Sequence, residues 1–190
     1  PVADRKDARN SEIEGRHSEA GGVAATFAID AQQSIEAGWT GGNERRFYDT
    51  VSSTKGGYRS TYDIDRSQAH VGWQGRFDGW RGRVQAYRSE IDIVNSASNG
   101  VTATRPQNLL DEVIDGHATV KLGGHQVTFG GEWRDETLTN AGLTTGRDSA
   151  THKALFVQDE VALGSSLMLT GGLRADNHEL FGSEVSPRAY

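Results

Sequence analysis

The sequence contains no cysteine and only three prolines among its 190 residues. Without cysteine the chain has no disulfide bonds and no thiolate metal site. The lack of cysteine does not indicate in which cellular compartment the protein resides. Apolar residues make up 35% of the chain, well below the roughly 45–50% of an ordinary globular domain. The chain therefore has few apolar residues with which to form a dry hydrophobic core.

Long hydrophobic runs and a strong basic charge are absent as well. No stretch reaches the roughly 18 apolar residues that indicate a transmembrane helix. Residues 1–10 contain neither an initiator Met nor the core of a signal peptide, so we expect an excised or processed piece. The net charge is −6, and no basic stripe with interleaved aromatic residues occurs. These features argue against a nucleic-acid partner.

Glycine, by contrast, is frequent, with 24 residues, which suits strands and tight turns in a chain that has little proline. Apolar and polar residues alternate with a period of two, as they do from Val23 to Asp30, and this alternation indicates β-strands. We expect four hairpins, whose strands include residues 23–30 with 35–40, 68–73 with 80–87, 117–122 with 127–134, and 153–163 with 167–177.

The strand within residues 153–163 alternates less clearly than the others. Two sets of residues compete there for the apolar side: Leu155, Val157, Asp159 and Val161 against Ala154, Phe156, Gln158 and Glu160. We favour the first set as the lipid-facing one.

The predicted connections differ in length between the two ends of the strands. Tight turns are expected near residues 32, 77, 124 and 165, and long polar loops near 43–58, 94–108 and 138–151. Short periplasmic turns and long extracellular loops are typical of outer-membrane barrels. Trp73 and Trp80 flank one tight turn, where such a barrel carries an aromatic girdle.

Charged side chains lie on the polar side of several strands, among them Glu132, Arg134, Arg174 and Asp176. A soluble sandwich would bury such charges at high cost, whereas the lumen of a barrel offers them water or partners. We therefore assign residues 21–190 to part of an antiparallel transmembrane barrel and residues 1–20 to an extracellular loop or strand end. The four charged residues are expected to be structural residues of the lumen.

The segment "ALFVQDEVALGSSLMLTGGLRADNHELFGSEVSPRAY" resembles the barrel of TonB-dependent outer-membrane receptors, most closely the branch of catecholate siderophore and colicin I receptors. The matching elements are an aromatic-x-Gln-Asp-Glu strand, a short turn, a Gly-Leu-Arg-x-Asp strand and a Ser-Pro-Arg segment. They fall at Phe156–Glu160, Gly164–Ser166, Gly172–Asp176 and Ser186–Arg188.

This resemblance implies an all-β, up-and-down barrel of about 22 strands, filled by an N-terminal plug and importing ferric siderophores with energy relayed by TonB. The sequence shows no plug and no TonB box, and it has about eight complete strands with a ninth beginning at Ser186. We expect an internal segment of a larger receptor in the bacterial outer membrane. The implied partners are membrane lipid, lipopolysaccharide, a ferric siderophore as transported ligand, and TonB through the absent N-terminal region.

No catalytic or metal-binding motif is found in the sequence. The six histidines form no His-x-x-x-His pair, and no Gly-x-Ser-x-Gly elbow occurs. We expect neither an enzyme nor a cofactor. Two other functions stay open: a complete small barrel with a structural or adhesion role, and a barrel enzyme of the outer-membrane protease or lipase kind.

The first long loop is the best candidate for ligand binding. It carries Arg45, Arg46, Tyr48, Tyr58, Arg59 and Tyr62. An anionic, aromatic ferric catecholate suits guanidinium groups and stacking faces. The alternative is a solvated loop whose arginines pair with lipopolysaccharide phosphates or with acidic residues of the loops.

Overall fold

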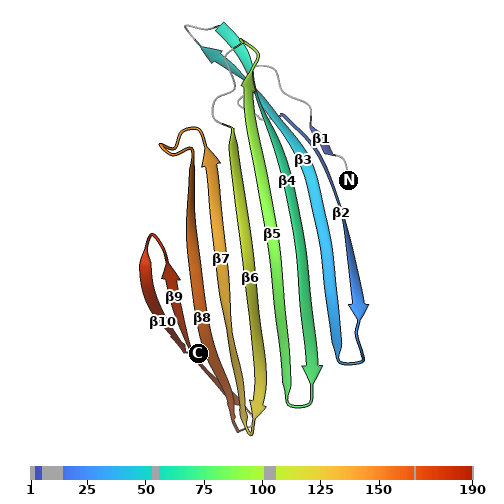
Figure 1. Cartoon of the computed structure of the whole chain (residues 1–190), viewed down its shortest axis with the longest axis vertical. Helices are drawn as coiled ribbons and strands as arrows, with labels where there is room; N and C mark the ends of the chain where they lie inside the picture. The colour runs from blue at the N-terminus through green and yellow to red at the C-terminus, as the bar shows by residue number, and fades with distance from the viewer. Residues whose placement is uncertain (1–2, 6–14, 53–55, 101–105, 165, 190) are drawn as a thin grey trace.

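The computed structural model describes residues 3–5, 15–52, 56–100, 106–164 and 166–189. Ten strands within these ranges form a single antiparallel sheet, and each strand pairs with its neighbours in the sequence (Figure 1). The strands are β1 Ala3–Arg5, β2 Gly15–Ala28, β3 Gln33–Ser52, β4 Gly56–Phe77, β5 Trp80–Ala97, β6 Gln107–Leu122, β7 His125–Asn140, β8 Arg147–Leu163, β9 Leu167–His178 and β10 Gly182–Ala189. The predicted fold, an up-and-down segment of a larger barrel, is confirmed.

The strand count differs slightly from the expected eight complete strands and a ninth. The short strand β1 was not expected, and it pairs with β2 at Arg16 to Ser18. β10 begins at Gly182 rather than at Ser186. No helix that is long and apolar enough to cross a membrane was found among the described residues.

Tight connections join β2 to β3, β4 to β5, β6 to β7 and β8 to β9 at one end of the sheet, which lies at the bottom of Figure 1. β4 and β5 are joined by Asp78 and Gly79 alone. Gly79 has a φ of 78°, in the left-handed region that glycine adopts without steric cost, and Asp-Gly is a favoured pair for such two-residue turns. We call this end the tight-turn end.

The loops predicted at the other end are too long, because the strands continue into them. β3 continues to Ser52 and β4 begins at Gly56, so most of the expected loop 43–58 is a paired ladder. β5 likewise continues to Ala97, and β8 begins at Arg147. These extensions carry polar residues on both sides of the strand, which removes the alternation signal without weakening the backbone hydrogen bonds.

The register divides the sheet into two faces, since directly opposed residues of antiparallel strands point to the same side. One row crosses the sheet through Glu36, Gly72, Gln85, Asp115, Glu132, Ala154 and Asp176. We call the face that carries this row the inner face, because a closed barrel turns its polar side inward. The opposite side is the outer face.

The outer face carries an apolar band next to the tight-turn end. One of its rows runs through Ala118, Phe129, Val157 and Leu173, and Phe129 and Val157 are 50% and 46% exposed. Within the described residues only Ile64, Val113 and Ala154 are almost fully buried hydrophobic side chains. The apolar side chains therefore cover the outside of a sheet, as the lipid-facing side of a barrel requires.

The apolar band shows which of the two competing sets of residues in β8 lies on the outer face. Val157 is opposed to Leu173 and Leu155 to Ala175, so the favoured set lies on the outer face. Phe156, from the other set, is opposed to Arg174 on the inner face.

Aromatic rings border the band at the tight-turn end. The ring centroids of Phe77 and Trp80 are 4.5 Å apart and stacked, and those of Trp73 and Trp80 are 6.4 Å apart. The indole nitrogen of Trp73 donates a hydrogen bond to the Gln33 side chain at 3.2 Å. Amphipathic rings such as those of Trp73 and Trp80 are typical of the boundary between lipid and water.

Candidate functional site

The six residues of the predicted ligand loop lie on β3 and β4, beyond the apolar band. A strand of about ten residues spans a bilayer, whereas β3 has 20 residues and β4 has 22. Because side chains alternate along a strand, the six do not form one group. Arg46, Tyr48, Tyr58 and Tyr62 lie on the inner face, and Arg45 and Arg59 lie on the outer face.

The two outer arginines each pair with a carboxylate of the neighbouring strand. Arg45 Nε lies 2.6 Å from Asp63 Oδ1, and Arg59 Nε lies 3.0 Å from Asp49 Oδ1. The guanidinium of Arg59 also lies over the ring of Phe47, 4.8 Å from its centroid. These side chains are substantially exposed, and exposed pairs of this kind contribute little to stability.

Three arginines of the inner face converge on one buried carboxylate, that of Glu44, which is 4% exposed. Arg16 of β2 reaches Glu44 Oε2 at 2.9 Å, Arg66 of β4 reaches it at 3.0 Å, and Arg46 bonds Oε1. Arg16 and Arg66 are 52% and 45% exposed, so they face the solvent of the inner side while Glu44 orients them. We call Arg16, Glu44, Arg46 and Arg66 the arginine cluster.

Tyrosine rings lie directly beyond the arginine cluster. Tyr48 and Tyr62 stack with centroids 6.1 Å apart and an angle of 19° between the rings. Tyr62 is directly opposed to Arg46 in the ladder. Aromatic faces and guanidinium groups therefore lie side by side on the inner face.

Arg16, Glu44 and Arg66 were not among the site residues predicted from the sequence. Glu44 lies two positions before Arg46, and a period of two places both on the same face. That signal was available in the sequence. Arg16 and Arg66 come from other strands, and only the register places them opposite Arg46 and Gly42.

The predicted structural residues of the lumen all lie on the inner face of β7 and β9. Arg174 donates to Asp176 at 2.9 Å and 3.0 Å. Arg134 lies 3.7 Å from Glu132 and 3.8 Å from Asp111. His152 of β8 joins the two groups: its ring nitrogens lie 3.0 Å from Asp176 and 3.6 Å from Glu132. His152 was missed because its strand offered no apolar alternation around it.

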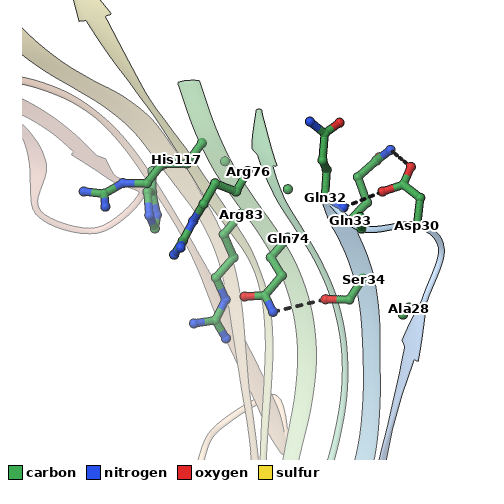
Figure 2. A pocket seen from close by; sticks show the side chains of 13 residues that line it. Ala28, Asp30, Gln32, Gln33, Ser34, Gln74, Arg76, Arg83 and His117 are labelled. Carbon is green, nitrogen blue, oxygen red and sulfur yellow. Dashed lines mark hydrogen bonds between the residues drawn. The ribbon is translucent and has the colours of Figure 1, made fainter. Parts of the chain in front are cut away.

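A cleft of about 500 Å³ opens on the inner face at the tight-turn end, between the β2–β3 turn and the strands β4 to β6 (Figure 2). The carboxylate of Asp30 accepts a hydrogen bond from the backbone N–H of Gln32 at 2.7 Å and from the side chain of Gln33 at 2.9 Å. These bonds, led by the one from Gln32, hold the pKa of Asp30 below its usual value. Arg76, Arg83 and His117 line the other side.

No group of three or more His, Asp or Glu residues that could hold a metal ion occurs in the part of the chain that the structure describes. The chemistry available on the inner face is therefore that of guanidinium groups, carboxylates, imidazoles and aromatic rings.

Two curated relatives share part of their length with this chain. The ferric enterobactin receptor PirA of Pseudomonas aeruginosa is 26% identical over 98% of this chain and 30% of its own length. The iron-regulated outer membrane virulence protein of Vibrio cholerae serotype O1 is 27% identical over 74% of this chain and 20% of its own length. The chain thus spans less than a third of these relatives, which are named for a receptor and a virulence protein rather than an enzyme.

Solved structures show the same fold. The ferric enterobactin receptor PfeA of Pseudomonas aeruginosa, in complex with BCV-L6, superposes with a TM-score of 0.81 at 17% identity, over 98% of this chain and 33% of that one. The siderophore receptor PirA of Acinetobacter baumannii gives 0.72 at 13% identity, over 93% of this chain and 31% of that one.

A family profile covers nearly the whole chain. The profile described as TonB dependent receptor-like, beta-barrel, matches residues 9–190. The matched region includes the strands β2 to β10, both faces of the sheet and the arginine cluster. The chain belongs to the family of TonB-dependent receptor-like β-barrels of the bacterial outer membrane.

Proposed function

We propose that this chain is the barrel portion of a receptor that imports a ferric siderophore, and that the arginine cluster with Tyr48 and Tyr62 helps to hold the chelate. The observation that carries the proposal is the stack of Tyr48 and Tyr62 beside three guanidinium groups on the inner face. Two similar proteins are named ferric enterobactin receptor and siderophore receptor, and these names support a ferric siderophore as the ligand.

The chemistry of the site suits an anionic aromatic ligand. A ferric catecholate carries negative charge and flat rings, which guanidinium groups and tyrosine faces bind through charge-assisted hydrogen bonds and stacking. Glu44 orients the guanidinium groups and limits the repulsion between them. The site lies at the end opposite the tight turns, which we assign to the extracellular side because tight turns face the periplasm in such barrels.

The proposed partners follow from the same assignment. Membrane lipid contacts the apolar band, and lipopolysaccharide surrounds the outer face beyond it, where Arg45 and Arg59 lie. TonB acts through a part of the receptor outside these 190 residues. No observation favours a small complete barrel with an adhesion role.

Neighbouring arginines provide the test, because Arg46 and Arg45 lie on opposite faces of β3. In the full-length receptor, we expect Arg46→Gln to weaken binding of ferric enterobactin about tenfold, the effect of one charge-assisted hydrogen bond. Arg45→Gln should change the affinity less than twofold. The variant Tyr48→Ala/Tyr62→Ala should also weaken binding by tenfold or more, because both tyrosine faces on which the rings of the chelate stack are lost.

Binding is measured by fluorescence quenching on purified receptor, and folding by the heat-modifiable mobility of the barrel on gels. Equal affinities in the Arg45 and Arg46 variants, with both barrels folded, would remove the arginine cluster from the proposed site. Unchanged binding in the tyrosine variant would remove the stack.

A further inference from the structure

An ion pair interrupts the apolar band on the outer face of β7 and β8. At the tight-turn end of β6 to β9, the outer-face positions carry glycine or an apolar residue, with two exceptions, His125 and Asp159. These positions are every second residue, from the first, of 116–122, 125–133, 155–163 and 167–175. His125 Nδ1 lies 2.7 Å from Asp159 Oδ2. Polar groups on the lipid side of a barrel are costly without partners, so this pair needs a physical explanation.

The pair lies at the depth of the aromatic rings that border the apolar band. Asp159 lies four residues before Leu163, the last residue of β8. Trp73 likewise lies four residues before Phe77, the last residue of β4. His125 is the first residue of β7, so its contact with Asp159 directs the carboxylate toward the tight-turn end. The pair therefore lies where lipid headgroups meet the acyl chains.

The carboxylate of Asp159 can accept a further hydrogen bond. It is partly exposed, as is the imidazole of His125. Among the described residues, Oδ1 of Asp159 is buried and has no donor, and Oδ2 accepts from the imidazole. Asp159 is directly opposed to Gly171 of β9. A Cβ at Gly171 would meet no heavy atom within 4 Å, so the space beside the carboxylate is open to a ligand.

The charges nearby favour an ammonium group over an anion. The basic residues at the tight-turn end of β4 to β6 lie on the inner face; they are Arg76, Arg81, Arg83 and Lys121. On the outer face, Asp159 supplies a negative charge and His125 is its polar neighbour. An anionic headgroup would meet this carboxylate without an arginine or lysine to bind it, whereas a headgroup with an ammonium group matches it.

We propose that His125 and Asp159 bind the headgroup of one membrane phospholipid that carries a primary ammonium group beside its phosphate. The ammonium group donates a charge-assisted hydrogen bond to the Asp159 carboxylate. Nδ1 of His125 is engaged with Asp159, which leaves Nε2 of the protonated imidazole to donate to the phosphate of the same headgroup. The acyl chains of this lipid lie against the apolar band.

This site discriminates between three classes of phospholipid. Phosphatidylethanolamine carries a primary ammonium group that donates hydrogen bonds. Phosphatidylcholine has a quaternary ammonium group without a donor, and phosphatidylglycerol is anionic. The inference goes beyond the import of a chelate and does not depend on it, because it uses only the division of the sheet into two faces and the membrane that surrounds the barrel.

Chemical coupling tests the contact. A water-soluble carbodiimide joins a carboxylate to a primary amine in contact with it, forming an amide while the reagent takes up the water. It is applied to the full-length receptor in vesicles of phosphatidylethanolamine and phosphatidylglycerol, and peptides that carry the lipid headgroup are identified by mass spectrometry. Glu160 is the matched control, because it follows Asp159 in β8 and lies on the inner face.

We expect a lipid adduct on Asp159 and none on Glu160. The adduct should disappear in Asp159→Asn, and also in vesicles where phosphatidylcholine replaces phosphatidylethanolamine. Equal modification of Asp159 and Glu160, or no adduct on Asp159 in a barrel of normal heat-modifiable mobility, would overturn the proposal.

A second measurement separates selective binding from mere contact with lipid. Native mass spectrometry of the delipidated receptor gives the affinity for the first bound lipid, with one headgroup at a time and the same acyl chains. We expect phosphatidylethanolamine to bind about tenfold more tightly than phosphatidylglycerol, as one charge-assisted hydrogen bond provides. Asp159→Asn should remove this preference. Asp63→Asn, which changes an outer-face carboxylate beyond the apolar band, should keep it.

Equal affinities for the two lipids in the parent receptor, or an unchanged preference in Asp159→Asn, would contradict the proposal. Binding of ferric enterobactin is measured in parallel and should be the same in Asp159→Asn as in the parent, so failure of the proposed function is detected separately.

Discussion

The outer and inner faces of β3 and β4 organise the same residue types in different ways. On the outer face, Arg45 pairs with Asp63 and Arg59 with Asp49. On the inner face, Arg16, Arg46 and Arg66 share the single carboxylate of Glu44. Adjacent residues of one strand thus belong to different electrostatic environments.

The difference indicates which side meets a ligand. Exposed pairs of opposite charge suit a surface in contact with water and a charged lipid layer, since they present little net field. Guanidinium groups gathered around one acid concentrate positive charge and hydrogen-bond donors where water is confined.

The largest expected effect tests the assignment of the two faces in the apolar band. Val157 lies on the outer face of β8, and Gln158, the next residue, lies on the inner face. We expect Val157→Arg to lower the free energy of unfolding by about 2–4 kcal/mol, the cost of a cation on the lipid side near the middle of a bilayer. Gln158→Arg should change it by less than about 1 kcal/mol, because the lumen supplies water and acids.

The measurement is urea-induced unfolding of the full-length receptor in lipid vesicles. If both variants lost the same free energy, the two faces of β8 would be equally hydrated, and the division into inner and outer faces would be wrong in this region.

A smaller effect is expected from removing the acid on each face of β3 and β4. Glu44→Gln leaves three guanidinium groups without their shared carboxylate, and we expect a loss of about 2 kcal/mol. This value is below the roughly 3–5 kcal/mol of fully buried pairs, because the arginines are about half exposed. Asp63→Asn, which removes the exposed partner of Arg45, should cost less than about 1 kcal/mol. The same unfolding experiment measures both, and a larger loss for Asp63→Asn would reverse the comparison.

The alternation of the sequence predicted the strands of the apolar band well. Where one side meets lipid and the other meets water, every second residue must be apolar, so the pattern from Val23 to Asp30 reveals a strand. Beyond the band both sides are polar. The residues from Asn43 to Tyr62 therefore carried no alternation and were taken for a loop, although the backbone of residues 43–52 and 56–62 continues the ladder.

The candidate site could be predicted only in part for the same reason. Tyr48 and Tyr62 were found by composition, since aromatic and arginine residues are dense in that segment. That Arg45 and Arg46 lie on opposite faces could be predicted only if the segment was known to be a strand. That Arg16 and Arg66 meet at Glu44 could be predicted only from the register of three strands. Pairing across strands is a tertiary property that local sequence does not record.

The smallest expected effect compares two arginine networks, one on each face. Arg174, 32% exposed, donates two hydrogen bonds to Asp176, which His152 also contacts. Arg88, 55% exposed, lies 3.5 and 3.6 Å from Glu90 and Glu112 on the outer face, too far for hydrogen bonds of good strength. We expect Arg174→Leu to lower the free energy of unfolding by about 1 kcal/mol and the outer-membrane yield with it, because Asp176 loses its main donor.

Arg88→Leu should have an effect too small to resolve, since exposed pairs of this geometry contribute close to nothing. Binding of ferric enterobactin should stay within twofold of the parent receptor in both variants, because neither arginine lies near Tyr48 and Tyr62 in the ladder. Yield and unfolding report the wall of the barrel, and chelate affinity reports the site. A loss of affinity in Arg174→Leu at unchanged stability would show instead that the network of Arg174, Asp176 and His152 takes part in holding the ligand.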